Sequence, residues 1–177
     1  QPFAKGGEDA CVLPSVALSV LWGDDGTEIK RYWGSRPQNT QYYFDEALTY
    51  TYMKSSGRRF GYPHPSSIFG HAGNVFVPNG GTWKALAYAN SRLVTYLMLC
   101  QTPERHWEVG NVSKLPWPSG LADADGVVDT VEDIAGAMLA TRQYDPTSPH
   151  YEGPSLLDGL GDGWVPDVYT SHPHRRL

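Results

Sequence analysis

The sequence predicts an α+β fold: a twisted, mostly antiparallel sheet of short strands packed on one long helix, with a second C-terminal helix and an irregular tail. Three observations predict it. Short aromatic, Thr-rich or apolar runs separated by turn residues fill the chain up to Gly81, as is typical of strands. Two later stretches repeat apolar residues at helical spacing. With 177 residues and 40% hydrophobic content, the chain can bury one core.

The N-terminal part contains a hairpin pattern. Val16–Trp22 is an apolar run of strand-forming residues, and Thr27–Trp33 alternates polar with apolar residues. Between them lies Gly23–Gly26 (GDDG), a turn cluster, so we expect a β-hairpin here. Further short strands are predicted at Gln41–Phe44, Leu48–Met53, Ser67–Phe69 and Val75–Val77.

The strongest helix pattern covers Thr82–Cys100. Its apolar residues recur every three or four positions, so one face can pack on the sheet. We expect the Thr82 side chain to cap the helix by accepting a backbone N–H bond. Pro103 follows the predicted end of the helix.

The pattern then changes to a short strand and a proline-bounded exit. Trp107–Val112 is predicted to be the strand, and Leu115–Pro118 (LPWP) is predicted to be extended because each Pro disfavours helix at the residue before it. Gly120–Gly126 is a linker in this interpretation, and Val127–Gln143 is a second amphipathic helix. The tail from Tyr144 is rich in Pro and Gly and has no strong periodicity.

Charge divides the chain into two regions. Residues 1–118 carry 11 Lys and Arg against 9 Asp and Glu, a net charge of +2. Residues 119–177 carry 3 basic and 10 acidic residues, a net charge of −7. We therefore predict a first region of residues 1–118 that can face DNA, and an acidic helix and tail in residues 119–177.

The composition also bears on the compartment. No run of 18 apolar residues is present, so no membrane contact is expected. The chain starts without Met, a basic region or an apolar leader, which favours a piece of a longer cytoplasmic protein over a secreted one. Cys11 and Cys100 are expected to be buried thiols rather than a disulfide.

Several short patterns suggest chemistry but are incomplete. Glu28 and Lys30 imitate half of a metal-dependent nuclease site, yet Asp24 and Asp25 are too near in sequence to share the metal. The six histidines lack Cys or carboxylate partners at ligand spacing, so no metal is expected. The segment GLGDG at 159–163 does not have the spacing of a dinucleotide loop.

The order of motifs in the second half of the first region is more informative. Asn90-Ser91-Arg92 lies in the predicted helix, the predicted strand Trp107–Val112 follows, and LPWP at 115–118 ends the series. This order resembles the end of target-recognition domains in restriction-modification methyltransferases and specificity subunits. Such domains have an Asn-Ser helix, a short strand and a Leu-Pro-x-Pro exit.

The start of the chain resembles one branch of these proteins. Pro2–Gly7 (PFAKGG), the predicted hairpin, Asn39 with Tyr42–Phe44, and Leu48–Tyr50 are similar to PglX-like adenine-specific DNA methyltransferases of BREX phage-defence systems. Related Eco57I-like and DISARM methylases share this pattern. The resemblance covers about residues 1–157.

The resemblance implies a division of labour. Enzymes of this family hold the flipped adenine with an Asn-Pro-Pro-Tyr-type tetrapeptide and bind S-adenosylmethionine with a Gly-rich loop, and this chain has neither. We therefore expect no catalytic residue and no cofactor in this fragment, and S-adenosylmethionine only in the parent enzyme. The expected partners are double-stranded DNA and an N-terminal catalytic methyltransferase domain.

The predicted DNA contacts are cationic and amide side chains at strand ends and loops, because such groups hold phosphates and bind base edges. The candidates are Lys5, Arg31, Arg36, Asn39, Gln41, Lys54, Arg58 and Arg59. Aromatic residues at 42–44, 50 and 52 can stack on bases, although core packing is their commoner role. Two alternatives stay open: a protein-interaction or DNA-mimic module, and a small metal-dependent nuclease.

Overall fold

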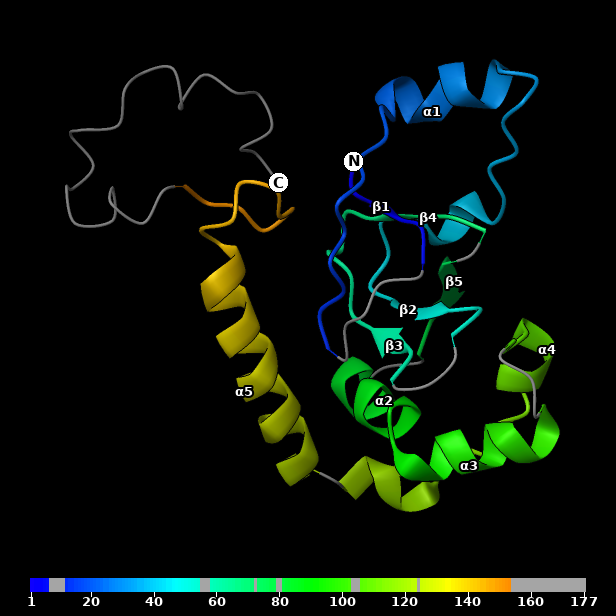
Figure 1. The fold of residues 1–177 in the computed structure, drawn as a ribbon, viewed down its shortest axis with the longest axis vertical. Coiled ribbons are helices and arrows are strands. Elements are labelled where there is room, and N and C mark those ends of the chain that lie inside the picture. Colours follow the sequence, from blue (N-terminus) through cyan, green and yellow to red (C-terminus); the bar gives the residue numbers. More distant parts are fainter. Residues whose placement is uncertain are drawn as a thin grey trace.

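The computed structural model describes residues 1–6, 12–54, 58–71, 73–78, 81–102, 106–123 and 125–153. It shows a mixed α+β fold, as predicted, in which small sheets lie between helices (Figure 1). Cys11 and the segment 159–163, for which the sequence made predictions, lie outside the described residues.

The strands are short and form two sheets. The first is antiparallel, with β2 (Leu48–Thr51) at its centre between β3 (Phe60–Gly61) and β5 (Gly73–Phe76). The second is a parallel pair of β1 (Phe3–Ala4) and β4 (Ile68–Phe69). The predicted strands at 48–53, 67–69 and 75–77 are thereby confirmed within a few residues.

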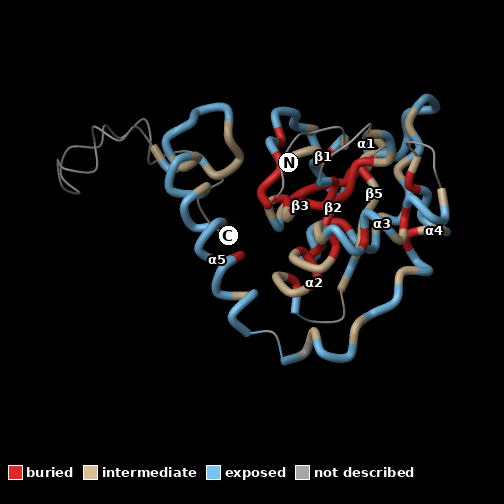
Figure 2. Tube along the Cα trace, turned by 60° about the horizontal axis from the view of Figure 1, so that its bottom comes forward, coloured by how far each residue is buried: buried red, intermediate tan, exposed pale blue. Residues whose placement is uncertain are grey.

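The core has two clusters of buried side chains, and both include residues of the strands. One cluster joins Leu48 and Tyr50 of β2 to the helices, and the other joins Ala4 and Ile68 of the parallel pair to Val16. Figure 2 shows this burial concentrated in the strands and in α2, while α5 is mostly exposed. The strands therefore form the centre around which the less buried elements are placed.

The predicted long helix is two helices, α2 (Thr82–Ala89) and α3 (Arg92–Gln101), so the single-helix prediction is wrong. The break lies at Asn90 and Ser91. The Asn90 amide donates to the Phe60 carbonyl at 2.8 Å and accepts from the Phe60 N–H at 3.1 Å, as a strand neighbour would. Ser91 has extended backbone angles, and its hydroxyl accepts from the Val94 N–H at 3.2 Å, which caps α3.

The Thr82 cap prediction is also wrong. The N-cap of α2 is Gly81, which has a left-handed φ of 65°, and no side chain caps this end. Thr82 is instead the first helical residue, and it is buried.

The predicted strand at 107–112 contains α4 (Val109–Val112), so this prediction is wrong as well. Trp107 donates its N–H to the Tyr52 carbonyl at 2.9 Å, but the Glu108 carbonyl then accepts from Asn111 and Val112. The local turn satisfies these backbone groups, so no strand continues.

The second predicted helix is confirmed. It is α5 (Asp125–Arg142), preceded by the 3-10 helix η2 (Ser119–Asp123) where a linker was expected. Val131 and Ala135 are its buried side chains, in the same core cluster as α2. The Arg142 guanidinium holds the end of α5 by donating to the Leu13 and Pro14 carbonyls, both at 2.7 Å.

The predicted N-terminal hairpin is wrong, because the turn cluster opens a helix, α1 (Gly23–Arg31). Asp24, Asp25 and Gly26 have left-handed φ values of 47°, 54° and 68° inside this element. Three consecutive residues in this region turn the chain tightly, and the segment 27–31 then continues as a right-handed helix. Asp and Gly are among the residues that tolerate such angles best, which is why the GDDG sequence allows this turn.

Two further expectations are corrected by the structure. Residues 41–44 form no strand; the 3-10 helix η1 (Thr40–Tyr42) starts after Asn39, which has a left-handed φ of 54°. Cys100 is an exposed free thiol rather than a buried one.

Candidate nucleic-acid interface

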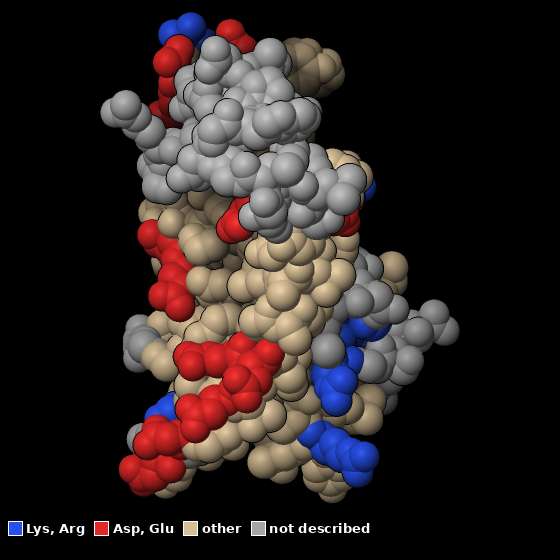
Figure 3. Space-filling view, turned by 90° about the vertical axis from the view of Figure 1, so that its left-hand side faces the viewer, with Lys and Arg blue, Asp and Glu red and all other residues tan. Residues whose placement is uncertain are grey.

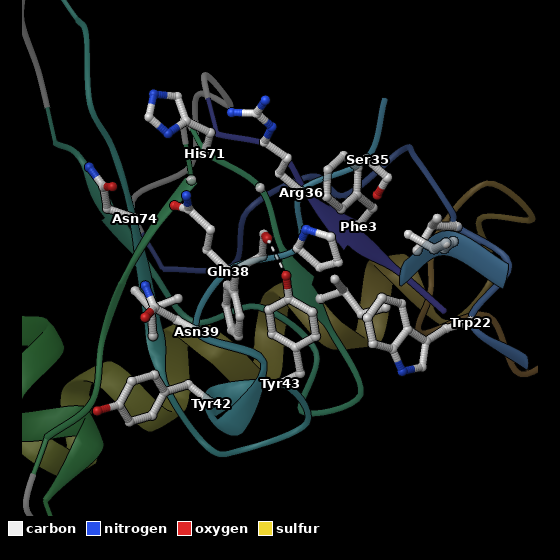
Figure 4. A pocket seen from close by; sticks show the side chains of 18 of the residues that line it. Phe3, Trp22, Ser35, Arg36, Gln38, Asn39, Tyr42, Tyr43, His71 and Asn74 are labelled. Carbon is white, nitrogen blue, oxygen red and sulfur yellow. Dashed lines mark hydrogen bonds between the residues drawn. The ribbon is translucent and has the colours of Figure 1, made fainter. Parts of the chain in front are cut away.

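A pocket with a volume of about 660 Å³ lies between α1, the segment 35–43 and the strands β1, β4 and β5. Its wall therefore comes from parts of the sequence that are far apart (Figure 4). The size is within the range of about 300–1,000 Å³ that small-molecule sites occupy. The pocket is large enough to be considered a binding site.

One side of the pocket is aromatic. The Trp22 ring lies 5.2 Å from the Tyr43 ring in an edge-on arrangement, and the Tyr43 ring lies 6.4 Å from that of Phe69. Tyr43 is buried, which raises the pKa of its hydroxyl, and it donates to the Phe69 carbonyl at 3.4 Å. Phe3 of β1 also lines the pocket, whereas Figure 4 shows the 41%-exposed Tyr42 on the other side, beside Asn39. This side is apolar and held in place by its own contacts.

The left-handed turn of α1 positions the Trp22 ring. A Cβ added to Gly26 would lie 2.6 Å from that ring, so only glycine lets the backbone and the ring approach so closely. Lys30 Nζ lies 5.4 Å from the centre of the same ring and bonds Asp25 at 2.7 Å. The sequence from Trp22 to Lys30 is thus a local clamp on one aromatic residue of the pocket.

The other side carries amide and cationic groups. Figure 4 shows Gln38, Asn39 and Asn74 on the side opposite Trp22, with Arg36 and His71 toward one end of the same view. Among the described residues that line the pocket, none is Asp or Glu. A pocket with donors, an arginine and no described carboxylate favours an anionic or neutral polar ligand.

Two predicted DNA contacts, Arg36 and Asn39, line this pocket. A third, Lys5, is exposed. Its backbone lies against Gly70 and Gly73, which line the pocket, so Lys5 lies at the border of the pocket. Arg31 and Gln41 are exposed on the adjoining α1 and η1 and are not among its described lining residues. The structure therefore brings the first five candidates to neighbouring elements.

The remaining candidates lie elsewhere, around the end of β2. Arg59 is 8% exposed, and its guanidinium lies 4.3 Å from the centre of the Trp107 ring. It donates to the Thr51 and Tyr52 carbonyls at 3.3 Å and to the Lys54 carbonyl, and burial lowers its pKa. Arg59 would lose these bonds on extending toward a duplex, and its contact with DNA stays a prediction.

The two neighbours of Arg59 in the candidate set differ from it. Lys54 is partly buried, and its ammonium donates to the Arg58 carbonyl at 2.9 Å. Arg58 is exposed. The Arg58 side chain is therefore accessible to a ligand, but it is not among the described residues that line the pocket.

Several pocket residues were absent from the predicted set. Gln38, His71 and Asn74 have no motif around them. Asn74 lies in β5, which pairs with β2, and His71 follows β4, which pairs with β1, so tertiary structure brings both to the pocket that Asn39 lines. Trp22 was interpreted as a strand residue, although its position just before a glycine-rich turn was the available signal.

Other titratable groups do not form a metal centre in the part of the chain that the structure describes, where no group of three or more metal-ligating side chains occurs. Lys30 bonds Asp25, while Glu28 is exposed. The His64 and His150 rings lie 5.0 Å apart, and burial lowers the pKa of both, that of His150 to about 4. No described helix combines the length and apolar character that crossing a membrane requires.

Comparisons with protein-family models and with curated proteins found no match to this chain. A functional assignment therefore depends on the motifs of the sequence and on the geometry of the pocket.

Proposed function

We propose that this chain is the DNA target-recognition module of an S-adenosylmethionine-dependent, adenine-specific N6 DNA methyltransferase in bacterial restriction-modification or phage defence. The cofactor and the methyl transfer belong to an N-terminal catalytic domain of the cytoplasmic parent enzyme. This chain supplies affinity for double-stranded DNA and its register on the duplex.

The observation that carries the proposal is the charge of the pocket surface in an acidic protein. The chain has a net charge of −5, yet Arg36 and His71 line a pocket whose described lining contains no carboxylate, and Lys5 borders it. DNA binding requires cations at phosphates and amide or guanidinium groups at base edges. Arg36 and Asn39 are of the types that pair with guanine and adenine in the major groove.

The motifs that suggested the family have structural roles here. Asn90 bonds the backbone of β3 and Ser91 caps α3, so this pair joins a helix end to the sheet. Trp117 of the LPWP segment lies 5.8 Å from the Tyr88 ring, and the Tyr88 hydroxyl donates to the Pro116 carbonyl. These motifs therefore serve to hold the helices and the sheet together. We assign the recognition of the DNA sequence to the loops.

The proposal is tested with the full chain and a mixed-sequence duplex across a series of salt concentrations. Wild type should bind with an affinity that falls as salt rises, and Arg36→Ala should reduce the log-affinity against log-salt slope by about 1 for one lost phosphate contact. Arg92→Ala is the matched control, because Arg92 is exposed on α3 and does not line the pocket. Equal slopes for all three proteins, or no binding by wild type, would contradict the proposal.

A protein-interaction module is the second candidate, and the exposed side of α5 favours it. Asp125, Asp129, Glu132 and Asp133 are exposed there. Figure 3 views this side of the molecule and shows Asp and Glu gathered in a band with Lys and Arg to one side. If this face binds a basic partner, the double variant Asp129→Asn, Glu132→Gln should abolish that binding and leave DNA affinity unchanged or slightly higher.

A further inference from the structure

We infer that the pocket between α1 and the strands binds one unstacked nucleotide, with the base against the aromatic side and the phosphate near Arg36 and His71. The inference rests on the proposed function, in that the nucleotide belongs to the DNA that this chain binds. It goes further by assigning a ligand to the pocket. That ligand is a nucleotide that has left the base stack, whereas recognition of an intact duplex uses only the edges of paired bases.

The first argument is shape. The pocket is concave, with a volume of about 660 Å³, whereas a DNA duplex is convex and covers the faces of its bases by stacking. A paired base offers only its edges to the grooves, and those are contacted by protruding side chains. A nucleotide that has left the stack presents a flat face and two edges that a cavity can enclose.

The second argument is the chemistry of the two sides. An aromatic wall with Trp22 and Tyr43 suits the face of a heterocycle, and the Tyr42 ring lines the pocket from the other side, beside Asn39. Gln38 and Asn39 each offer an amide donor and an amide acceptor, which is what the edge of a base requires. A phosphate is compatible with this lining because its described residues include Arg36 and no carboxylate.

The third argument is that the wall is already in place. Tyr43 is held by its bond to the Phe69 carbonyl, and the Trp22 ring lies against Gly26 and under Lys30. The backbone at Asn39 is followed directly by η1, whose Tyr42 N–H bonds the Asn39 carbonyl at 3.0 Å. A pre-formed site loses less conformational entropy on binding, which favours a ligand as small as one nucleotide.

The probe is 2-aminopurine deoxyribonucleoside monophosphate, whose fluorescence falls when the base stacks on an aromatic ring. Wild type should quench it saturably. Tyr42→Ala should weaken binding at least about fivefold, the effect of losing one base–aromatic contact. Tyr96→Ala is the matched control, because Tyr96 is 64% exposed on α3 and does not line the pocket.

A second variant assigns the phosphate. Arg36→Ala should weaken binding of the monophosphate and leave binding of the 2-aminopurine deoxyriboside unchanged. If wild type does not quench the probe, the pocket is not a nucleotide site. The same holds if Tyr42→Ala binds the probe as tightly as wild type and the Tyr96→Ala control do. Equal losses for both forms of the probe in Arg36→Ala overturn the phosphate assignment.

The same proteins separate this inference from the proposed function. Salt-dependent duplex binding without quenching of the probe sinks the inference and keeps the DNA-recognition function. Pocket-dependent quenching without duplex binding supports the nucleotide site and sinks the DNA-recognition function.

Discussion

The region around Arg59 and the pocket around Arg36 place the same guanidinium group in opposite surroundings. Arg59 lies over the Trp107 ring and bonds backbone carbonyls, and it is 8% exposed. Arg36 is exposed at the border of a pocket. The first region uses its cation to join β2 to the segment before α4, whereas the second leaves its cation facing solvent.

The difference shows that an arginine in a loop can either stabilise the fold or remain exposed to a ligand. The sequence of the loop alone does not tell which role a given arginine has. A buried guanidinium requires acceptors for its N–H groups, and the end of β2 supplies carbonyls for them. An exposed one needs no acceptor, so it is available to a phosphate. Stability should therefore depend on Arg59, and ligand binding on Arg36.

The largest expected effect is that of Arg59→Ala. The change leaves the carbonyls of Thr51, Tyr52 and Lys54 without this donor and removes the contact with Trp107. We expect the free energy of unfolding to fall by about 2–4 kcal/mol, measured by urea denaturation. Arg36→Ala and Arg58→Ala, both at exposed residues, should stay within about 0.5 kcal/mol of wild type. A similar loss in all three would remove the contrast.

A smaller effect is expected from Gly26→Ala in the wall of the pocket. The new Cβ would meet the Trp22 ring and would require a left-handed φ of 68° for alanine. We expect a loss of about 1–3 kcal/mol in the free energy of unfolding, together with weaker quenching of the nucleotide probe. Gly23→Ala is the control from the same turn, because apart from its chain neighbours and the backbone of its own helix nothing lies within 4 Å of the added Cβ. Probe binding that survives Gly26→Ala would show that Trp22 does not shape the site.

The smallest stability effect concerns pH and the paired histidines. The His64 and His150 rings lie 5.0 Å apart. Burial is the main cause that lowers the pKa of His150 to about 4, and the charges of His64 and Arg142 add to it. Above pH 6.5 both the folded and the unfolded chain keep these imidazoles neutral. As pH falls from 6.5 toward 4, the unfolded chain takes up protons that the folded chain does not, so stability decreases.

We expect this decrease to be on the order of 1–2 kcal/mol, because the rings are only partly buried. Urea denaturation at several pH values should show a flatter dependence for His150→Gln. His71→Gln, at an exposed residue of the pocket, should keep the wild-type dependence. A wild-type slope in His150→Gln would mean that other groups control acid stability.

The sequence was sufficient where the structure is determined by local patterns. The apolar spacing at 127–143 predicted α5 because one face of a helix must be buried. The aromatic, Thr-rich run near Leu48 predicted β2, because such residues favour strands. The mixed α+β class followed from these elements. Charge and residue type also selected Arg36 and Asn39, which line the pocket, and their contact with DNA stays a prediction.

Tertiary structure alone decided the elements whose backbone groups bond to distant segments. The helical pattern continues past Asn90 in the sequence. In the structure, the Asn90 side-chain amide donates to the Phe60 carbonyl and accepts from the Phe60 N–H, and α2 ends there. The same holds for Arg59, whose acceptors come from β2 and the residues after it, and for the pocket, which forms only when β4 and β5 approach the segment 35–43. Local periodicity contains no information on these partners, because long-range pairing depends on which segments meet when the core forms.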